Sequence, residues 1–326
     1  MVVLREGMCP GLDEDVVRDL LEDLVASDTE ELAQKCSVSY KALLAIRRVL
    51  LAQHTAFPVS GLDLYEELVS STAILSTSIP SLDKLLDSGL YTGEITELSG
   101  APGTGKSQVC FATATHTAHR LKQSVIYIDT TGGLSATRLL QMLQVQTDET
   151  GEQTEALQRI RVFRVFDIFS LLDCLHGLRC GGLQQASLGG GSVKAVILDS
   201  VSAIISPTLG GKQNEGMSLM MQVAGTLKTI AKDFNVAVLV TNHMTRGPGG
   251  EPQAGLGLSW SHVPRTRLLL ERSDGAGPLL GSKRTATLVK SSRRPCHIKA
   301  EFDFNRGSRP EEGLLGGVRV RDGSDP

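Results

Sequence analysis

The chain has 326 residues, enough for one large α/β domain and a smaller accessory domain. Hydrophobic residues make up 41% and charged residues 21%, a balance that is ordinary for a globular protein and argues against general disorder. The net charge of −3 argues against DNA binding by bulk electrostatics, so any nucleic-acid contact must be a local patch or be shared with a partner. No run approaches the roughly 20 apolar residues that span a bilayer, and the first residues lack a secretory signal. We therefore expect a soluble intracellular protein without membrane contacts.

The cysteines are scattered along the chain without a C-x-x-C pair. Metal sites built from thiolates need ligands paired at short spacing, and disulfides are rare inside cells. We therefore expect buried, reduced thiols, and neither disulfides nor a zinc site, at Cys9, Cys36, Cys110, Cys174, Cys180 and Cys296.

Residues 1–54 predict a small helical domain. Ser39 is a candidate helix N-cap, and Leu43, Ile46 and Leu50 follow it at helical spacing. The segment Phe57-Pro58-Val59-Ser60-Gly61 interrupts this pattern. We therefore predict that residues 55–71 form a linker that docks a partner.

Residues 72–306 predict a large α/β domain, because apolar, β-branched segments alternate with helical ones. The predicted strands are 95–98, 125–128, 162–166, 195–198 and 236–240. Helices are expected at 108–121, 135–144, 168–178 and 216–234. This alternation implies a mostly parallel sheet with helices on both faces.

After Arg265 the pattern changes to strands joined by turns. Segments 266–271, 285–290 and 298–304 predict an antiparallel C-terminal extension of the sheet. The glycine-rich segment 181–192 is predicted to be a flexible loop, and residues 307–326 a disordered tail.

A phosphate-binding loop stands between a predicted strand and a predicted helix. It reads Gly100-Ala101-Pro102-Gly103-Thr104-Gly105-Lys106-Ser107. Its glycines let backbone N–H groups converge on phosphate oxygens at the positive end of the following helix. In such a loop the Lys106 ammonium contacts the β and γ phosphates, and the Ser107 hydroxyl is a Mg²⁺ ligand. A chance match in an ordinary turn would not need this strand–loop–helix context, so the sequence predicts a nucleotide site.

Three further polar residues are candidates for the same site. Asp199 follows the buried strand 195–198 and could hold the hydration shell of Mg²⁺, although an Asp in this place also serves as a helix cap. Asp129 follows strand 125–128 and is either a base for the attacking water or a brace for its loop. His243 follows strand 236–240 and is either a sensor of the γ-phosphate or a satisfied buried histidine. Lys106, Asp129 and His243 are thus the catalytic candidates.

The sequence around these motifs resembles a known family. Residues 82–98 lead into the phosphate loop, and Tyr127-Ile128-Asp129-Thr130, Leu198-Asp199-Ser200 and Val240-Thr241-Asn242 follow in order. Over residues 12–306 this is similar to the RecA-like recombinases of eukaryotes and archaea. Within that family it most resembles the Rad51 paralogues, and paralogue D among them, on details such as Cys9-Pro10-Gly11-Leu12 and Lys290-Ser291-Ser292-Arg293.

The resemblance implies a RecA-like P-loop ATPase core with a small all-helical N-terminal domain, and ATP and Mg²⁺ as cofactors. It implies a nuclear protein acting in homologous recombination repair of DNA double-strand breaks and stalled forks. Such a subunit would bind single-stranded DNA within a heteromeric complex of paralogues that assists the main recombinase. Gln108 would complete the nucleotide site, and Arg138 would stack on the adenine; the other interpretation of Arg138 is a solvated helix arginine.

Departures from the family pattern qualify this expectation. Thr131 stands where active recombinases carry the glutamate that orients the hydrolytic water, so we expect a weak DNA-stimulated ATPase. The segments 206–216 and 244–258, which match the DNA-facing loops, contain few cations, and this favours weak DNA binding completed by partners. The region 290–295, which in the family caps a neighbour's nucleotide, lacks the usual acidic residue and is either a phosphate contact or a DNA patch. Two alternatives remain: a self-sufficient strand-exchange recombinase, and a non-hydrolysing scaffold with a vestigial nucleotide site.

Overall fold

A computed structural model describes residues 33, 39–44, 60–187, 191–209, 213–246, 252–272 and 283–304. The chain divides into two compact units, Met1–Leu68 and Val69–Pro326. In the first unit residues 40–44 are helical, directly after Ser39, whose carbonyl accepts from the backbone N–H groups of Ala42 and Leu43. Leu43 is fully buried, as its helical spacing predicts. The predicted positions Ile46 and Leu50, the segment 55–59 and the tail 307–326 lie outside the described residues.

Within the described part of the second unit, a nine-stranded sheet has the order β11-β10-β9-β3-β7-β6-β4-β5, with β8 paired to β7. Neighbours among β3, β4, β5, β6, β7 and β9 pair in parallel, whereas β10 and β11 extend the sheet in antiparallel fashion. This confirms the predicted mostly parallel sheet with an antiparallel C-terminal extension. The strands are β3 (Ile95–Gly100), β4 (Ser124–Asp129), β5 (Ile160–Arg164), β6 (Val193–Asp199), β7 (Ala237–Arg246), β8 (Pro252–Ala254), β9 (Thr266–Arg272), β10 (Lys283–Lys290) and β11 (Lys299–Asp303). A separate two-stranded sheet pairs β1 (Ile74–Leu75) with β2 (Leu90–Tyr91) in antiparallel fashion.

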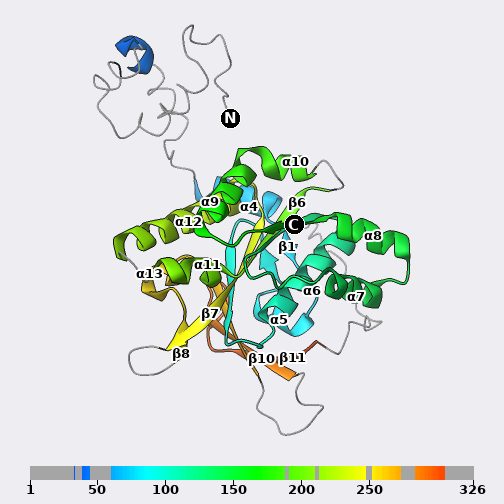
Figure 1. Cartoon of the computed structure of the whole chain (residues 1–326). Coiled ribbons are helices and arrows are strands. Elements are labelled where there is room, and N and C mark those ends of the chain that lie inside the picture. Colours follow the sequence, from blue (N-terminus) through cyan, green and yellow to red (C-terminus); the bar gives the residue numbers. More distant parts are fainter. Residues whose placement is uncertain are drawn as a thin grey trace, which may run out of the picture. The chain divides into compact units, whose positions relative to one another are not determined.

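Helices cover both faces of the sheet (Figure 1). Strands β3 and β4 are fully buried because each face of the sheet packs against a separate apolar cluster. One face packs against α5 (Pro80–Leu85), α6 (Lys106–His119), α7 (Ala136–Gln146) and α8 (Thr150–Gln158). The other packs against α9 (Ile168–Gly177), α11 (Val201–Thr208), α12 (Gln213–Asp233) and α13 (Gly257–Ser261).

Several predicted boundaries differ from the structure. The strand predicted at 162–166 is β5, which begins and ends two residues earlier. The predicted flexible loop 181–192 is wrong over its first half, because the chain kinks at Cys180 and Gly181 and then continues as α10 (Leu183–Ser187). Leu183 and Ala186 are buried in the core, and this packing outweighs the flexibility that the glycines suggest. Residues 61–71 of the predicted linker form α4 (Gly61–Ser71).

The described cysteines are free, and not all of them are buried. Cys110 is buried and Cys174 half-buried, but Cys180 and Cys296 are exposed, which corrects the expectation of buried thiols. Across the residues that the structure covers, no helix has the length and apolar character needed to cross a membrane.

Candidate functional site

The predicted site residues lie at the carboxyl ends of neighbouring strands. The phosphate loop follows β3, His243 lies on β7, and Asp199 ends β6, so the strand order β3-β7-β6 brings them to one edge of the sheet. Gly100 is paired with His243 in the parallel register of β3 and β7. This is the edge at which open α/β sheets bind their ligands.

The phosphate loop has the backbone that a phosphate cradle requires. Gly103 and Gly105 have φ angles of +76° and +99°, which side-chain-bearing residues rarely adopt. The Lys106 Nζ donates to the carbonyls of Gly100 and Ala101, at 2.7 and 3.0 Å. Burial lowers the pKa of Lys106, while the negative charge of Asp199 opposes this shift. A buried ammonium of this kind gains from an anionic ligand, because the ligand's charge offsets its lost hydration.

A cavity of about 410 Å³ opens over this loop. It brings together Lys106, Ser107, Gln108, Asp199 and His243, which the sequence predicted to share one site. An ammonium, a hydroxyl and a carboxylate lining one cavity match the donors and acceptors that a nucleotide triphosphate with a hard divalent cation requires. The residues present therefore fit the cofactors that the motifs imply.

The Asp199 carboxylate is held from behind by two hydroxyls. Tyr127 donates to its Oδ2 at 2.9 Å, and Thr241 donates to its Oδ1. Burial raises the pKa of Tyr127, so the phenol remains a donor. A carboxylate has about four acceptor positions, so Asp199 can accept further hydrogen bonds from the cavity side. This orientation allows it to receive the water shell of a metal.

Asp129 is occupied by its own loop. Its Oδ1 accepts from the backbone N–H groups of Thr131, Gly132 and Gly133, and its Oδ2 accepts from that of Leu134, all at 2.9 to 3.3 Å. The side chain is 1% exposed. Of the two roles that the sequence left open, this geometry favours the brace over the base. The loop that Asp129 braces carries Thr131, which does line the cavity.

His243 lines the cavity and lies close to Lys106. Its Nε2 is 3.5 Å from the Ser200 hydroxyl, and its backbone N–H donates to Ser202. Burial lowers the pKa of His243, and the Lys106 charge lowers it further, while Asp199 opposes both. His243 is therefore neutral at pH 7, which suits a residue that senses a phosphate through a single hydrogen bond.

Arg138 is tied to the nucleotide cavity through Gln108. Helix α7 begins after Ser135, whose hydroxyl caps the N–H of Arg138. The Arg138 Nε donates to Gln108 Oε1 at 2.9 Å, and its Nη1 donates to Gln141 at 3.2 Å. The guanidinium is thus held beside Gln108, which lines the cavity, rather than fully solvated. Its stacking on an adenine stays a prediction.

Two cavity residues come from the C-terminal extension and were missed by the sequence analysis. Arg284 on β10 and Phe304, just after β11, line the cavity beside Gly105. A methyl group placed on Gly105 would lie 2.5 Å from the Phe304 ring. Neither residue belongs to a motif, and the position of both depends on how β10 pairs with β9 and with β11.

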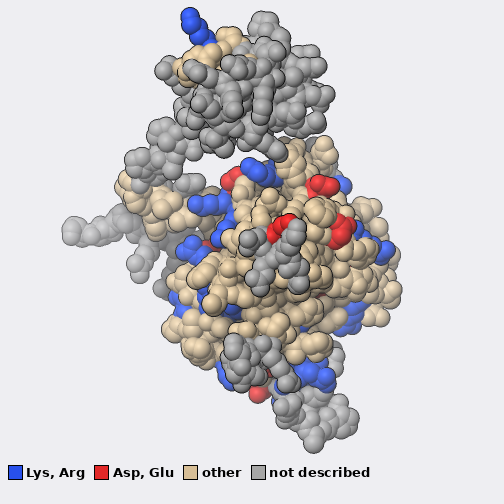
Figure 2. Space-filling view, turned by 60° about the vertical axis from the view of Figure 1, so that its left-hand side comes forward, with Lys and Arg blue, Asp and Glu red and all other residues tan. Residues whose placement is uncertain are grey.

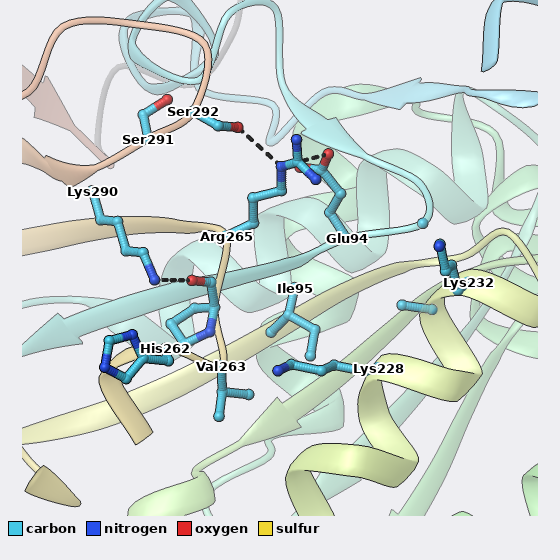
Figure 3. A pocket seen from close by; sticks show the side chains of 13 residues that line it. Glu94, Ile95, Lys228, Lys232, His262, Val263, Arg265, Lys290, Ser291 and Ser292 are labelled. Carbon is cyan, nitrogen blue, oxygen red and sulfur yellow. Dashed lines mark hydrogen bonds and ion pairs between the residues drawn. The ribbon is translucent and has the colours of Figure 1, made fainter. Parts of the chain in front are cut away.

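A second cavity, of about 470 Å³, lies at the opposite end of β3, around Gly93 to Ile95. Figure 3 shows the lysines 228, 232 and 290 around it, together with Arg265. Lys290 donates to the carbonyls of Ser261 and Pro264, and the charge of Arg265 is balanced by Glu94 at 3.3 Å. With three lysines and a single acidic residue in its lining, this cavity suits an anionic ligand.

Arg293 and Arg294 are engaged within their own chain. Arg293 forms a bidentate ion pair with Glu94 and lies 3.7 Å over the Tyr91 ring. Arg294 donates to the Lys84 carbonyl and lies 4.0 Å from Asp87. Within region 290–295, Lys290 is therefore the cation that lines the second cavity, and Arg293 and Arg294 do not line it.

The two predicted DNA-facing segments are partly regular structure. Segment 206–216 is the end of α11 and the beginning of α12, with 210–212 outside the described residues. Segment 244–258 continues β7 into an antiparallel pairing with β8, with 247–251 outside the described residues. On the face drawn in Figure 2, Lys and Arg side chains occur in separate groups, with Asp and Glu side chains between some of them. The described basic side chains on this face therefore do not form one continuous surface.

Comparison with known proteins agrees with this architecture. The family model described as Rad51 matches residues 69–296, and the one described as RAD51D, N-terminal domain, matches residues 1–53. The chain is 56% identical to DNA repair protein RAD51 homolog 4 of Bos taurus over 318 residues, which cover 95% of this chain and 97% of the relative. The Mus musculus protein of the same name is 55% identical over 312 residues, covering 93% and 95%. The DNA repair and recombination protein RadA of Aeropyrum pernix is 26% identical over 288 residues, covering 84% and 85%. These matches confirm the resemblance found in the sequence, and the chain belongs to the Rad51 family.

Proposed function

We propose that this chain is an ATP-binding subunit of a complex of recombinase paralogues that acts in homologous recombination repair of DNA double-strand breaks and stalled forks. The observation that carries the proposal is the convergence of Lys106, Ser107 and Asp199 on one cavity whose lining has Thr131 in place of a catalytic glutamate. The names of the relatives, which describe DNA repair proteins, support the biological role. A protein with this DNA repair role acts in the nucleus.

In this proposal the subunit binds ATP with Mg²⁺. The loop N–H groups and Lys106 hold the phosphates, and Ser107 and Asp199 hold the metal, which would neutralise phosphate charge when bound. Gln108 and Arg138 contact the base side, and His243 senses the terminal phosphate. Because Asp129 braces its loop and Thr131 has no ionisable oxygen, hydrolysis is slow.

The second cavity supports assembly with other subunits. Its lysines lie at the amino end of β3, whereas the nucleotide cavity lies at the carboxyl end of the same strand. A subunit with an anion-binding cavity at each end of one strand can hold its own nucleotide at one end and face a neighbour's phosphates at the other. The partners in this proposal are other recombinase paralogues, with single-stranded DNA bound by the assembly and the main recombinase assisted indirectly.

Purification of the tagged full-length chain from its own cells, with and without ATP, tests this proposal. We expect stoichiometric recovery of related P-loop paralogues, and more of them with ATP than without. Mass spectrometry identifies the partners, and mass photometry gives the stoichiometry. Recovery of a homopolymer without related proteins would instead support the self-sufficient recombinase and overturn the proposal.

Replacing Thr131 with glutamate is expected to raise ATP turnover. Thr131 lines the cavity beside the phosphate loop, so a carboxylate at this position can reach the attacking water. A positioned general base typically contributes a factor of about 100 to 10,000, so an increase on the order of tenfold is a conservative expectation. The measurement is steady-state phosphate release with and without single-stranded DNA.

Thr131→Gln is the matched control, because glutamine has the size of glutamate but cannot accept a proton at neutral pH. It should leave turnover unchanged. Equal acceleration by both variants, or a wild-type rate as fast as that of a self-sufficient recombinase, would show that the missing carboxylate does not limit hydrolysis.

A further inference from the structure

The C-terminal extension presents one face to the phosphate loop. Alternate residues of β9, β10 and β11 point to the same side of a sheet, and on this side they are apolar and buried where they pack near α6. These buried positions are Leu268, Leu270, Ala286, Leu288 and Phe302. The same alternation continued along β9 and β10 brings Arg272 and Arg284 to positions where the pattern would otherwise predict apolar residues.

Arg272 and Arg284 are direct cross-strand partners. The antiparallel register of β9 and β10 pairs Arg284 with Arg272, and that of β10 and β11 pairs Arg284 with Phe302. Like charges that lie directly opposite each other on one face of a sheet are destabilising. Arg284 Nη1 donates to the Lys283 carbonyl at 3.0 Å, and an anion bound beside the two guanidinium groups would be attracted by both of them.

Both arginines lie beside the phosphate loop. A methyl group placed on Gly103 would lie 3.9 Å from Arg272 Nη1. Arg284 lines the nucleotide cavity together with Lys106 and Ser107. The Phe304 ring, which packs edge-on against Phe302 at 5.3 Å between centroids, covers Gly105 and fixes how closely the extension approaches the loop.

We propose that Arg272 and Arg284 form a phosphate clamp that binds the polyphosphate of the nucleotide held by the same chain. This inference rests on the proposed nucleotide-binding function and adds two cations to Lys106. All three come from one subunit, so the clamp would let this chain retain a triphosphate without cations from a neighbour. Its ligand class is a nucleoside di- or triphosphate, because only the phosphates carry charge that guanidinium groups can contact.

The clamp is tested by nucleotide titrations of the full-length chain with the partners it retains. The variants are Arg272→Gln, Arg284→Gln and their combination, each in competition with a fluorescent ATP analogue. The combined variant should weaken ATP binding by roughly tenfold or more, since each arginine would lose a charge-assisted contact. The effect should decrease from ATP to ADP to AMP and be absent for adenosine. Lys283→Gln, on the opposite face of β10 and 4.0 Å from Glu301, is the charge-matched control and should leave binding unchanged.

The outcomes separate this inference from the function on which it rests. If Lys106→Ala weakens ATP binding while the arginine variants do not, the clamp is wrong and the nucleotide site stands. If none of the variants, Lys106→Ala included, changes ATP affinity, the nucleotide-binding function fails as well. Arg272 is exposed, so Arg272→Gln should fold even if the combined variant does not, and it should still weaken ATP more than adenosine. An equal loss for adenosine would indicate general damage to the site and overturn the clamp.

Discussion

Lys106→Ala is expected to weaken ATP binding by roughly 10- to 100-fold, because the loop loses the charged donor that contacts the phosphates. The residue Lys106 is 7% exposed and lines the same cavity as Ser107 and Asp199. Isothermal titration calorimetry or competition with a fluorescent ATP analogue measures the loss. Lys299→Ala, at an exposed position on β11, is the matched control and should bind ATP normally.

The same substitution should change the stability of the ligand-free protein little. The two hydrogen bonds that Lys106 donates to the Gly100 and Ala101 carbonyls are lost, but so is the cost of burying its charge, which lowers its pKa. We expect the free energy of unfolding to change by about 1 kcal/mol or less. ATP should then raise the melting temperature of the wild type but not that of the variant. This linkage distinguishes loss of binding from loss of folding.

The recovery of partner proteins with the Lys106→Ala variant distinguishes a nucleotide-dependent subunit from a pure scaffold. If ATP at the cavity holds the complex together, Lys106→Ala should lower partner recovery to the level seen without ATP. If the nucleotide site is vestigial, partner recovery and repair in cells should both be unchanged. The variant therefore tests the function as well as the chemistry of the loop.

The positions of site residues could be predicted from the sequence where they depend on contiguous segments, but not where they depend on contacts between distant segments. The phosphate loop and Asp199 could be predicted, because strand, loop and helix are contiguous and the carboxyl ends of parallel strands share one edge. Arg284 and Phe304 could not, because their placement depends on the pairing of β10 with β9 and β11. The helical segment at Leu183 was missed for a similar reason, since its apolar partners lie on distant elements of the core.

Arg267→Met is expected to destabilise the core by roughly 3–5 kcal/mol, because it leaves the buried Glu97 carboxylate without its cationic partner. Arg267 Nε and Nη2 lie 2.8 and 2.7 Å from Glu97 Oε2, and Glu97 is fully buried. For a domain of this size the loss corresponds to a fall in melting temperature of roughly 6–20 °C. Thermal and urea unfolding measure it. Arg265→Met, whose side chain is 59% exposed, is the control and should cost no more than about 1 kcal/mol.

This ion pair also joins neighbouring strands at the centre of the sheet, so its loss is expected to affect more than one contact. Glu97 and Arg267 are register partners on β3 and β9, and Asn242 of β7 donates to the other carboxylate oxygen of Glu97 at 2.7 Å. The three side chains thus join the strand that leads into the phosphate loop to the neighbours on both sides.

The combined variant Glu97→Leu/Arg267→Met should regain most of the lost stability, because a buried pair replaced by apolar side chains of similar volume is often neutral. It should also bind ATP normally, since β3 and β9 keep their backbone pairing. If Arg267→Met unfolds no more easily than Arg265→Met, the pair does not hold β9 to β3. The placement of the C-terminal extension over the phosphate loop would then rest on the backbone pairing of β9 with β3 and on its apolar packing.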